Sequence, residues 1–208
     1  MNICVCMYYD DKIKDYGNIN SAMNKNYCEK YNLSFICSNT SFYIDRHPAW
    51  ERIPLLLNNI HNYDYLIWID ADAFFYNHAN NITNIINNYN NYNFIFSNDI
   101  SNNNINSGVF IVKNTQYSID FLNKWGYDTD LYNNNPYPYW WDQGVLIHMY
   151  NNNILDIKNN SKLIDFGILQ EFNLNDDLNN NTFVCHLAGR SHIDRFKILI
   201  DFYNKINN

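Results

Sequence analysis

The chain has 208 residues, the size of one domain, and it is 47% hydrophobic with only 17% charged residues. Its net charge is −7 and it has no run of lysines or arginines, which argues against a protein that binds nucleic acid through its phosphates. Its apolar runs are far shorter than the roughly 20 residues that span a bilayer. We therefore expect one globular domain over residues 1–208, without a membrane span.

Cysteine and asparagine usage add two expectations. The five cysteines are an odd number and none lies in a C-x-x-C arrangement, which indicates reduced core thiols in a cytoplasmic protein. Asparagines are abundant and cluster between periodic segments, for example at 102–104, 133–135 and 179–181. Because asparagine suits turns, these clusters are predicted to be loops.

The first half of the chain alternates short apolar runs with helical patterns. Strands are predicted at 3–9, 33–37, 65–69 and 94–96, and helices at 19–31, 50–60 and 82–89. The run 65–69 is continuously apolar, which is typical of a strand covered on both faces. Pro54 is expected to confine or kink the helix in which it lies.

The second half is less regular. It predicts a strand at 109–112, a helix from 118 to 125 with Asn114 as its N-cap, and a buried helix at 145–150. A late strand at 183–188 precedes a closing helix whose start carries the capping box Ser191-x-x-Asp194. Strands that alternate with helices predict an α/β sandwich around a mostly parallel sheet.

Two carboxylates follow the buried strand 65–69 directly. Asp70 and Asp72 are separated by one small residue, at the end of a strand where ligands of open α/β sheets bind. Two desolvated acids repel each other unless a cation lies beside them, and oxygen donors favour magnesium or manganese. The structural alternative is that Asp70 begins a turn and Asp72 caps the next segment.

A histidine in the late strand is the second candidate. His186 is either a hydrogen-bonded core residue or the one nitrogen ligand of an oxygen-rich metal site. Gly189 would let backbone N–H groups approach an anion, and Arg190 adds a cation beside them.

The third candidate follows two tryptophans, Trp140 and Trp141. Asp142 at the start of a helix is by default an N-cap. The functional alternative places Asp142 and Gln143 on the floor of a cleft with the tryptophans as its wall. Such a cleft suits a sugar, which has apolar faces and hydroxyl edges.

Two further segments are weaker candidates, and several common motifs are absent from the sequence. The segment Asn106-Ser107-Gly108 before a strand is commonly a plain turn, and Arg52 in an apolar helix is expected to be solvated rather than a phosphate clamp. There is no G-x-G-x-x-G, Walker, H-E-x-x-H or G-x-S-x-G motif. With only 6 glycines, a diphosphate would have to be neutralised by a metal and by cationic side chains.

The order of these pieces resembles the galactosyl transferase GMA12/MNN10 family, glycosyltransferase family thirty-four. The resemblance spans roughly residues 3–190 and is carried by segments 48–56, 68–74, 106–110, 142–144 and 183–189. It implies a GT-A fold and a manganese-dependent enzyme that transfers a hexose or pentose with retention of configuration. By the same resemblance, the donor would be a nucleoside-diphosphate sugar, with UDP favoured over GDP, and the acceptor would be a glycan or a protein-linked group.

The resemblance also implies roles for individual residues. The ligands of Mn²⁺ or Mg²⁺ would be Asp70, Asp72 and His186, and the reacting face would carry Asp142 and Gln143. Donor binding would fall to the remaining motif residues, namely Tyr8, Tyr9, Arg52, Asn106, Gly189 and Arg190.

The chain also departs from that family. Members usually carry an N-terminal membrane anchor, whereas none is expected from these residues, and Gly189-Arg190 replaces a frequent Gly-Cys pair. A viral origin would place the protein in the host cytoplasm or the virion. Two other functions stay open, a metal-dependent nucleotidyltransferase and a catalytically silent sugar- or nucleotide-binding module. A homodimer is one option for the oligomeric state, because many tyrosines would suit an interface.

Overall fold

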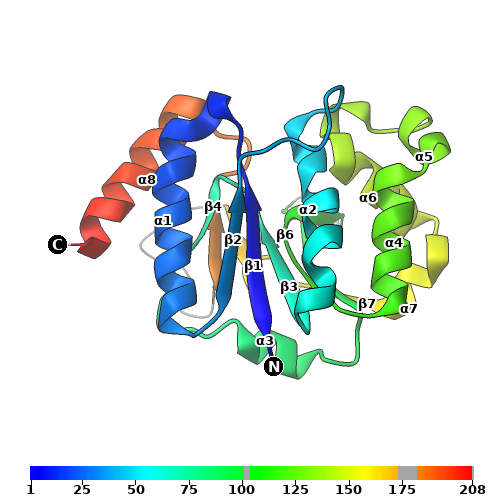
Figure 1. Cartoon of the computed structure of the whole chain (residues 1–208), viewed down its shortest axis with the longest axis horizontal. Coiled ribbons are helices and arrows are strands. Elements are labelled where there is room, and N and C mark those ends of the chain that lie inside the picture. Colours follow the sequence, from blue (N-terminus) through cyan, green and yellow to red (C-terminus); the bar gives the residue numbers. More distant parts are fainter. Residues whose placement is uncertain (101–103, 173–181, 208) are drawn as a thin grey trace.

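The computed structural model describes residues 1–100, 104–172 and 182–207. A six-stranded sheet, in the order β2-β1-β3-β6-β5-β7, lies between two layers of helices (Figure 1). Its strands are β1 (Ile3–Tyr8), β2 (Ser34–Ser38), β3 (Tyr65–Ile69), β5 (Phe94–Asn98), β6 (Ile105–Lys113) and β7 (Ser161–Ile164). Only β6 runs against its neighbours, β3 and β5, and the other pairings are parallel. The predicted α/β class with a mostly parallel sheet is confirmed.

Alternate residues of β1 face two different hydrophobic clusters. Ile3, Val5 and Met7 pack in the cluster that includes α1 (Lys14–Lys30) and the C-terminal helix α8 (His192–Asn207). Cys4 and Cys6 face the cluster that includes α2 (Arg52–Asn59), α4 (Gln116–Tyr127) and α6 (Trp141–Asn151). Figure 1 shows these helices on opposite sides of the sheet. Both faces of β1 and β3 are therefore covered, and every residue of the two strands is buried.

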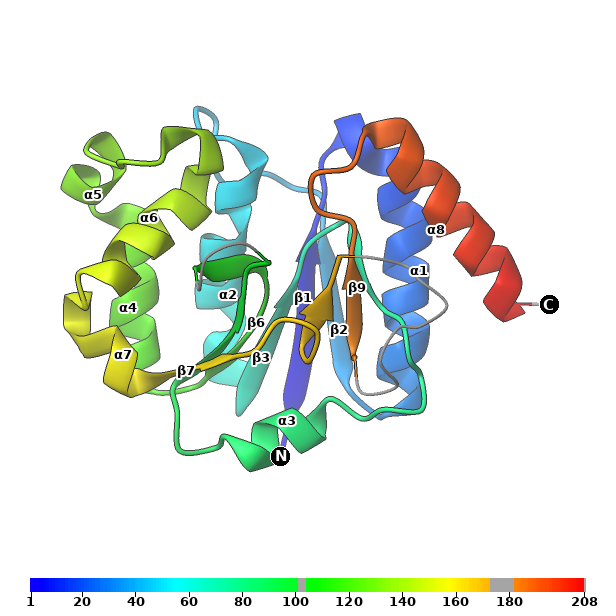
Figure 2. The ribbon, with the colours of Figure 1, turned by 180° about the vertical axis from the view of Figure 1, so that it is seen from behind.

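A second, smaller sheet lies beside α1. It has the order β4-β9-β8 and consists of β4 (Ala73–Phe75), β9 (Val184–His186) and β8 (Gln170–Glu171). β9 is antiparallel to β4, and its last residue pairs with the first residue of β4. Figure 2 shows β9 between α1 and the central sheet. The remaining helices are α3 (Thr83–Asn88), α5 (Thr129–Asn133) and α7 (Ile157–Asn160). The small sheet thus brings the late part of the chain to the segment that follows β3.

Several smaller predictions can also be compared with the structure. All five cysteines are free thiols. In the described part of the chain, no helix combines the length and the apolar character that crossing a membrane requires. Pro54 is tolerated because it is the third residue of α2, where no intrahelical N–H bond is needed. The predicted loops at 102–103 and 179–181 lie outside the described residues.

One predicted helix cap is wrong and another is confirmed. Thr115, not Asn114, caps α4, since its side chain accepts from the Ser118 amide at 3.2 Å. Asn114 uses its own amide group to bind a backbone carbonyl in the loop before β3. Ser191 does cap α8, because its Oγ accepts from the Asp194 amide at 3.2 Å.

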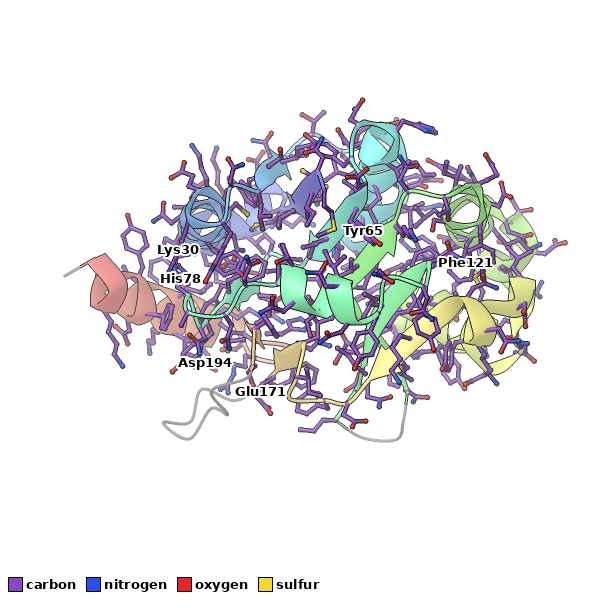
Figure 3. The ribbon with its side chains drawn as sticks, turned by 90° about the horizontal axis from the view of Figure 1, so that it is seen from below. Lys30, Tyr65, His78, Phe121, Glu171 and Asp194 are labelled. Atoms are coloured by element: carbon purple, nitrogen blue, oxygen red, sulfur yellow. The ribbon has the colours of Figure 1, made fainter. Side chains whose placement is uncertain are left out.

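The loop after β4 is attached to α1 by side-chain donors. Lys30 Nζ donates to the His78 carbonyl at 2.6 Å, and Tyr31 donates to the same oxygen at 2.8 Å. Figure 3 shows Lys30 and His78 together at the end of α1. The chain therefore stays against α1 after it leaves β4.

Two buried asparagines of α1 hold the segment between β3 and β4. Asn20 Nδ2 donates to the carbonyls of Ala71 at 2.7 Å and Ala73 at 2.8 Å. Asn24 donates to Ala73 O at 3.0 Å and accepts from the Phe75 amide at 3.1 Å. These bonds satisfy backbone groups that would otherwise be buried without partners. They fix the short segment that carries the two predicted carboxylates.

We expect Asn20→Ala to lower the free energy of unfolding by about 2 kcal/mol, because the Ala71 carbonyl loses its donor and the Ala73 carbonyl keeps only the bond from Asn24. Urea denaturation followed by circular dichroism measures this change. Asn26→Ala, at an exposed position of the same helix, should change the value by less than about 0.5 kcal/mol. Equal effects of the two substitutions would contradict this role for Asn20.

Candidate active site

A cleft with two lobes opens where β1 and β3 end. The lobes have volumes of about 410 and 390 Å³, each large enough for a small molecule. We name them the Tyr8 lobe, lined by the chain after β1 and the start of α1, and the His186 lobe, lined by the starts of β6 and α6 and the chain at β9. Six residues line both, namely Ala49, Arg52, Asp70, Asp72, Trp141 and Arg195.

The strand directions explain why distant residues meet here. β1 and β3 are parallel, so Tyr8 and Asp70 reach the same edge of the sheet. β6 runs the opposite way with Val109 opposite Ile69, so its early residues lie at this edge as well. The site is therefore formed by the ends of β1 and β3 and by the beginning of β6.

Asp70, Asp72 and His186 come together, as the sequence predicts. Their ligand atoms all lie within 4.8 Å of one another. His186 Nε2 is 3.4 Å from Asp72 Oδ1 and 3.9 Å from Asp70 Oδ2. The pairing of His186 with Ala73 in the small sheet produces this contact. The turn predicted at Asp70 is also present, since its carbonyl accepts from the Ala73 amide at 2.9 Å.

This group of side chains fits a hard divalent cation. Ligands of an octahedral ion with bonds of about 2.1 Å lie about 3–4 Å apart, which is close to the separations observed here. His186 Nδ1 lies 2.9 Å from Oε1 of the buried Gln170. A proton on Nδ1 donates to that oxygen and leaves the Nε2 lone pair facing the carboxylates, as a metal ligand requires. His186 is thus both a hydrogen-bonded core residue and a candidate ligand.

Charges around Asp72 offset one another. Arg195 Nη2 lies 2.8 Å from Asp72 Oδ2, on the other side from His186. Burial lowers the pKa of His186, but the facing carboxylates of Asp72 and Asp70 outweigh it and raise that pKa overall. Burial likewise opposes the ionised form of Asp72, yet His186 and Arg195 lower its pKa. Asp72 is therefore held as a carboxylate.

Arg52 is buried, so the prediction of a solvated residue is wrong. Its Nη2 lies 3.1 Å from Asp70 Oδ1 and its Nε lies 3.1 Å from Asp142 Oδ2. The same guanidinium donates to the carbonyls of Ala49 and Ser107. A helix can bury an arginine only where such partners satisfy it. Arg52 thus links the end of β3 to the start of α6.

Asp142 is also buried, and it is not the N-cap of α6. The helix begins one residue earlier, at Trp141, so the Asp142 carboxylate turns inward to Arg52 instead of toward the helix end. Burial raises the pKa of Asp142 to about 7, with Arg52 opposing the shift and Asp70 adding to it. Its protonation state therefore changes near neutral pH.

The segment Asn106-Ser107-Gly108 lies inside β6, so the prediction of a plain turn is wrong. Its partner strand β5 has an irregular register at 96–97, which accommodates the extra length of β6. Ser107 N donates to Gln143 Oε1 at 2.9 Å, and Asn106 Nδ2 donates to Asp99 Oδ2 at 3.2 Å. Asn106, Ser107, Gln143 and Asp99 all line the His186 lobe.

The remaining predicted residues divide between the cleft and its outside. Tyr8 and Tyr9 line the Tyr8 lobe, and Tyr9 donates from its hydroxyl to Asn18 at 2.6 Å. Gly189 lines the His186 lobe with a φ of 73°. Arg190 is not among the residues of either lobe, and its guanidinium donates to the Phe172 carbonyl at 3.3 Å.

Sequence reasoning missed Arg195 and Tyr16. Arg195 of α8 lines both lobes, and Tyr16 of α1 lines the Tyr8 lobe. Neither residue lies in a motif, and Tyr16 precedes the predicted helix 19–31. Their place in the cleft depends on the packing of α8 on α1, which only the folded chain shows.

The family model described as "Protein of unknown function, DUF273" matches residues 19–166. The chain belongs to the DUF273 family. The match includes Asp70, Asp72, Asp142 and Gln143 but ends before His186. No curated protein matches the sequence. Membership of the GMA12/MNN10 family stays a prediction.

Solved structures place this DUF273 protein among GT-A glycosyltransferase folds. A glycosyltransferase involved in the glycosylation of the major capsid of PBCV-1 has a TM-score of 0.79 at 16% identity, over 97% of this chain and 100% of that one. The galactosyltransferase LgtC has a TM-score of 0.55 at 12% identity, over 97% and 95%. The bifunctional WbbM has a TM-score of 0.59 at 11% identity, over 98% of this chain and 51% of that one. At these identities the likeness shows the fold, and the predicted GT-A fold is confirmed.

Gly108 leaves the space that His186 occupies, since a Cβ at this position would lie 2.1 Å from the imidazole Cε1. We expect Gly108→Ala to displace the ring and weaken Mn²⁺ binding about tenfold or more, measured by isothermal titration calorimetry. Gly126→Ala, whose Cβ would meet Ile53 instead, should keep the wild-type affinity for Mn²⁺. Unchanged affinity in Gly108→Ala would show that His186 is not a ligand.

Proposed function

We propose that this DUF273 protein is a glycosyltransferase that uses a divalent cation and a nucleoside-diphosphate sugar, with UDP favoured over GDP. It transfers a hexose or pentose to a hydroxyl group of a glycan or a protein-linked acceptor. The observation that carries the proposal is the convergence of Asp70, Asp72 and His186 in the cleft, where the two carboxylates line both lobes. The neighbouring structures support it, since LgtC was solved with donor and acceptor sugar analogues.

The two lobes differ in a way that suits the two ends of such a donor. The Tyr8 lobe offers aromatic rings from Tyr8, Tyr9 and Tyr16, against which a nucleobase can pack. The His186 lobe offers amide and carboxylate groups, among them Asn106 and Gln143, which suit sugar hydroxyls. The diphosphate would then lie at the junction of the lobes, beside the three ligand residues.

Positive charge at that junction has two sources. Mn²⁺ or Mg²⁺ held by Asp70, Asp72 and His186 would supply charge that stabilises the diphosphate leaving group. Arg195 lies at the same junction, and its side chain is 25% exposed against 4% for Arg52, so its guanidinium can bind a phosphate oxygen beside its pairing with Asp72. Arg52 is already engaged by Asp70 and Asp142, so it positions these carboxylates rather than the phosphates.

The proposed reaction retains configuration by attack from the face that the diphosphate leaves. The bond from the anomeric carbon to the diphosphate breaks, the bond to the acceptor oxygen forms, and the acceptor proton passes to the leaving phosphate. Asp142 supports the positive charge that develops on the sugar. The hydrogen bond from Ser107 orients the Gln143 amide, whose Nε2 can donate to a sugar hydroxyl. Asp142 is 1% exposed and paired with Arg52, which favours this supporting role over direct nucleophilic attack.

Incubation with a panel of UDP- and GDP-sugars, with and without Mn²⁺, tests the function. We expect UDP or GDP to be released only when Mn²⁺ is present. Chromatography of the nucleotides and the free sugar measures this release. Pyrophosphate exchange would instead indicate a nucleotidyltransferase. A thermal shift without any product would indicate a binding module, and either result would overturn the proposal.

Asp72→Asn is the variant that tests the metal dependence. It should abolish Mn²⁺-dependent donor binding, measured by calorimetry, because a ligand and its charge are lost. Asp201→Asn removes an exposed carboxylate from α8 and should bind the donor as the wild type does. Full turnover in Asp72→Asn would make the proposed metal site wrong.

Asp142→Asn should separate chemistry from binding. We expect turnover to fall by at least about 100-fold, since one electrostatic support of the transition state is removed, while Mn²⁺-dependent donor binding is retained. The Asp142 carboxylate ionises as the pH rises through its pKa of about 7. Wild-type turnover should therefore decrease as the pH is lowered from above 7 to below it. The residual activity of Asp142→Asn should lack this limb of the pH profile. Turnover at the wild-type level, or loss of donor binding, would contradict the assignment.

A further inference from the structure

An exposed aromatic surface borders the His186 lobe. It consists of Tyr137, Tyr139, Trp140 and Trp141, and we name it the aromatic ledge. These side chains are 39%, 87%, 46% and 45% exposed, respectively. Trp140 and Trp141 also line the His186 lobe, directly before Asp142 and Gln143. The ledge is therefore continuous with the part of the cleft proposed for the reaction.

The backbone of the ledge is held in a fixed shape. Asn135 Nδ2 donates to Trp141 O at 3.0 Å and its Oδ1 accepts from Tyr137 N at 2.9 Å. The rings of Tyr137 and Trp140 stack with centroids 5.7 Å apart. A Cβ on Gly144 would lie 2.3 Å from the Tyr137 carbonyl, so the segment packs directly on α6. Such order lowers the entropic cost of binding a ligand.

Trp141 ties the ledge to the other wall of the cleft. Its ring stacks on His47 with centroids 3.7 Å apart and planes inclined by 5°. The connection between α5 and α6 accordingly runs beside the loop that precedes α2 (Figure 2). Trp141 also has a φ of 46°, a strained conformation for a non-glycine residue. The chain accepts this strain while directing two tryptophans to the cleft.

The chemistry of the ledge favours a neutral, hydroxyl-rich ligand. Residues 127–141 contain Asp128 and Asp130 but no lysine or arginine, which argues against an anionic membrane surface or a nucleic acid. Aromatic faces pack against the apolar faces of a sugar ring, and tyrosine hydroxyls can bind its edges. Next to the carboxylate and amide of Asp142 and Gln143, this combination matches a carbohydrate.

We infer that the ledge binds the acceptor, and that the acceptor is an oligosaccharide. Its terminal unit enters the His186 lobe and receives the transferred sugar, while the next unit packs on Tyr139 and Trp140. This inference rests on the proposed glycosyltransferase function. It narrows the acceptor from any hydroxyl compound to a chain of at least two sugars.

Ligand-observed NMR titrations test the ledge without using catalysis. Trisaccharides of glucose, mannose, galactose, xylose and N-acetylglucosamine are compared with their monosaccharides, with UDP and the diamagnetic Mg²⁺ present. We expect at least one trisaccharide to bind about tenfold more tightly than its monosaccharide. Tyr139→Ala and Trp140→Ala should remove that advantage. Both side chains are exposed, and thermal unfolding verifies that the variants fold.

Phe42→Ala is the matched control, since Phe42 is 47% exposed and lines neither lobe. It should bind the trisaccharide as the wild type does. Equal affinity for all trisaccharides and monosaccharides, or wild-type affinity in both ledge variants, would overturn the inference. So would efficient transfer to a peptide with no trisaccharide binding. Release of UDP or GDP without any acceptor, measured separately, shows whether a failure lies in the ledge or in the proposed function.

Discussion

Three carboxylates converge at one edge of the sheet, and their mutual repulsion is the constraint that organises the surrounding structure. Arg52 lies between Asp70 and Asp142, while Arg195 pairs with Asp72. Removing one partner from a buried ion pair typically costs about 3–5 kcal/mol, so these positions depend strongly on one another. This explains a buried guanidinium in the apolar helix α2. It also gives Arg195, which α8 brings to the cleft from the far end of the chain, a partner in Asp72.

The order and direction of the strands bring these charged residues together from distant parts of the chain. His186 follows Asp72 by more than one hundred residues, yet the pairing of β9 with β4 places it beside the carboxylates. β6 brings Asn106 and Ser107 to the same edge because it runs against β3. Asn20 of α1 anchors the backbone between Asp70 and Asp72. The pairing of the strands therefore determines where the candidate ligands lie. The charged side chains around them then determine their protonation states.

Features formed by neighbouring residues could be predicted from the sequence, whereas contacts between residues far apart in the chain could not. The strand 65–69 and its two carboxylates are local features, so periodicity and position identified them. The burial of Arg52 depends on Asp142, ninety residues away, and a pattern within one helix cannot reveal such a partner. Arg195 belongs to the cleft only because α8 packs on α1. His186 was already a candidate from its place in an apolar strand, and the resemblance added its role as a ligand and the GT-A fold. The retaining mechanism and the donor base stay predictions.

The strained backbone at Trp141 affects how Asp142 and the neighbouring aromatic rings are oriented. A positive φ in a residue with a large side chain costs about 1–3 kcal/mol and persists only where the surroundings enforce it. An ordinary helix start would avoid that cost, and it would turn Asp142 outward as a cap. Here α6 begins with the strained residue, Asp142 faces Arg52, and the Trp141 ring stacks on His47 at the junction of the two lobes. One backbone distortion thus buries the carboxylate and exposes the aromatic rings, two features that the proposed sugar transfer requires together.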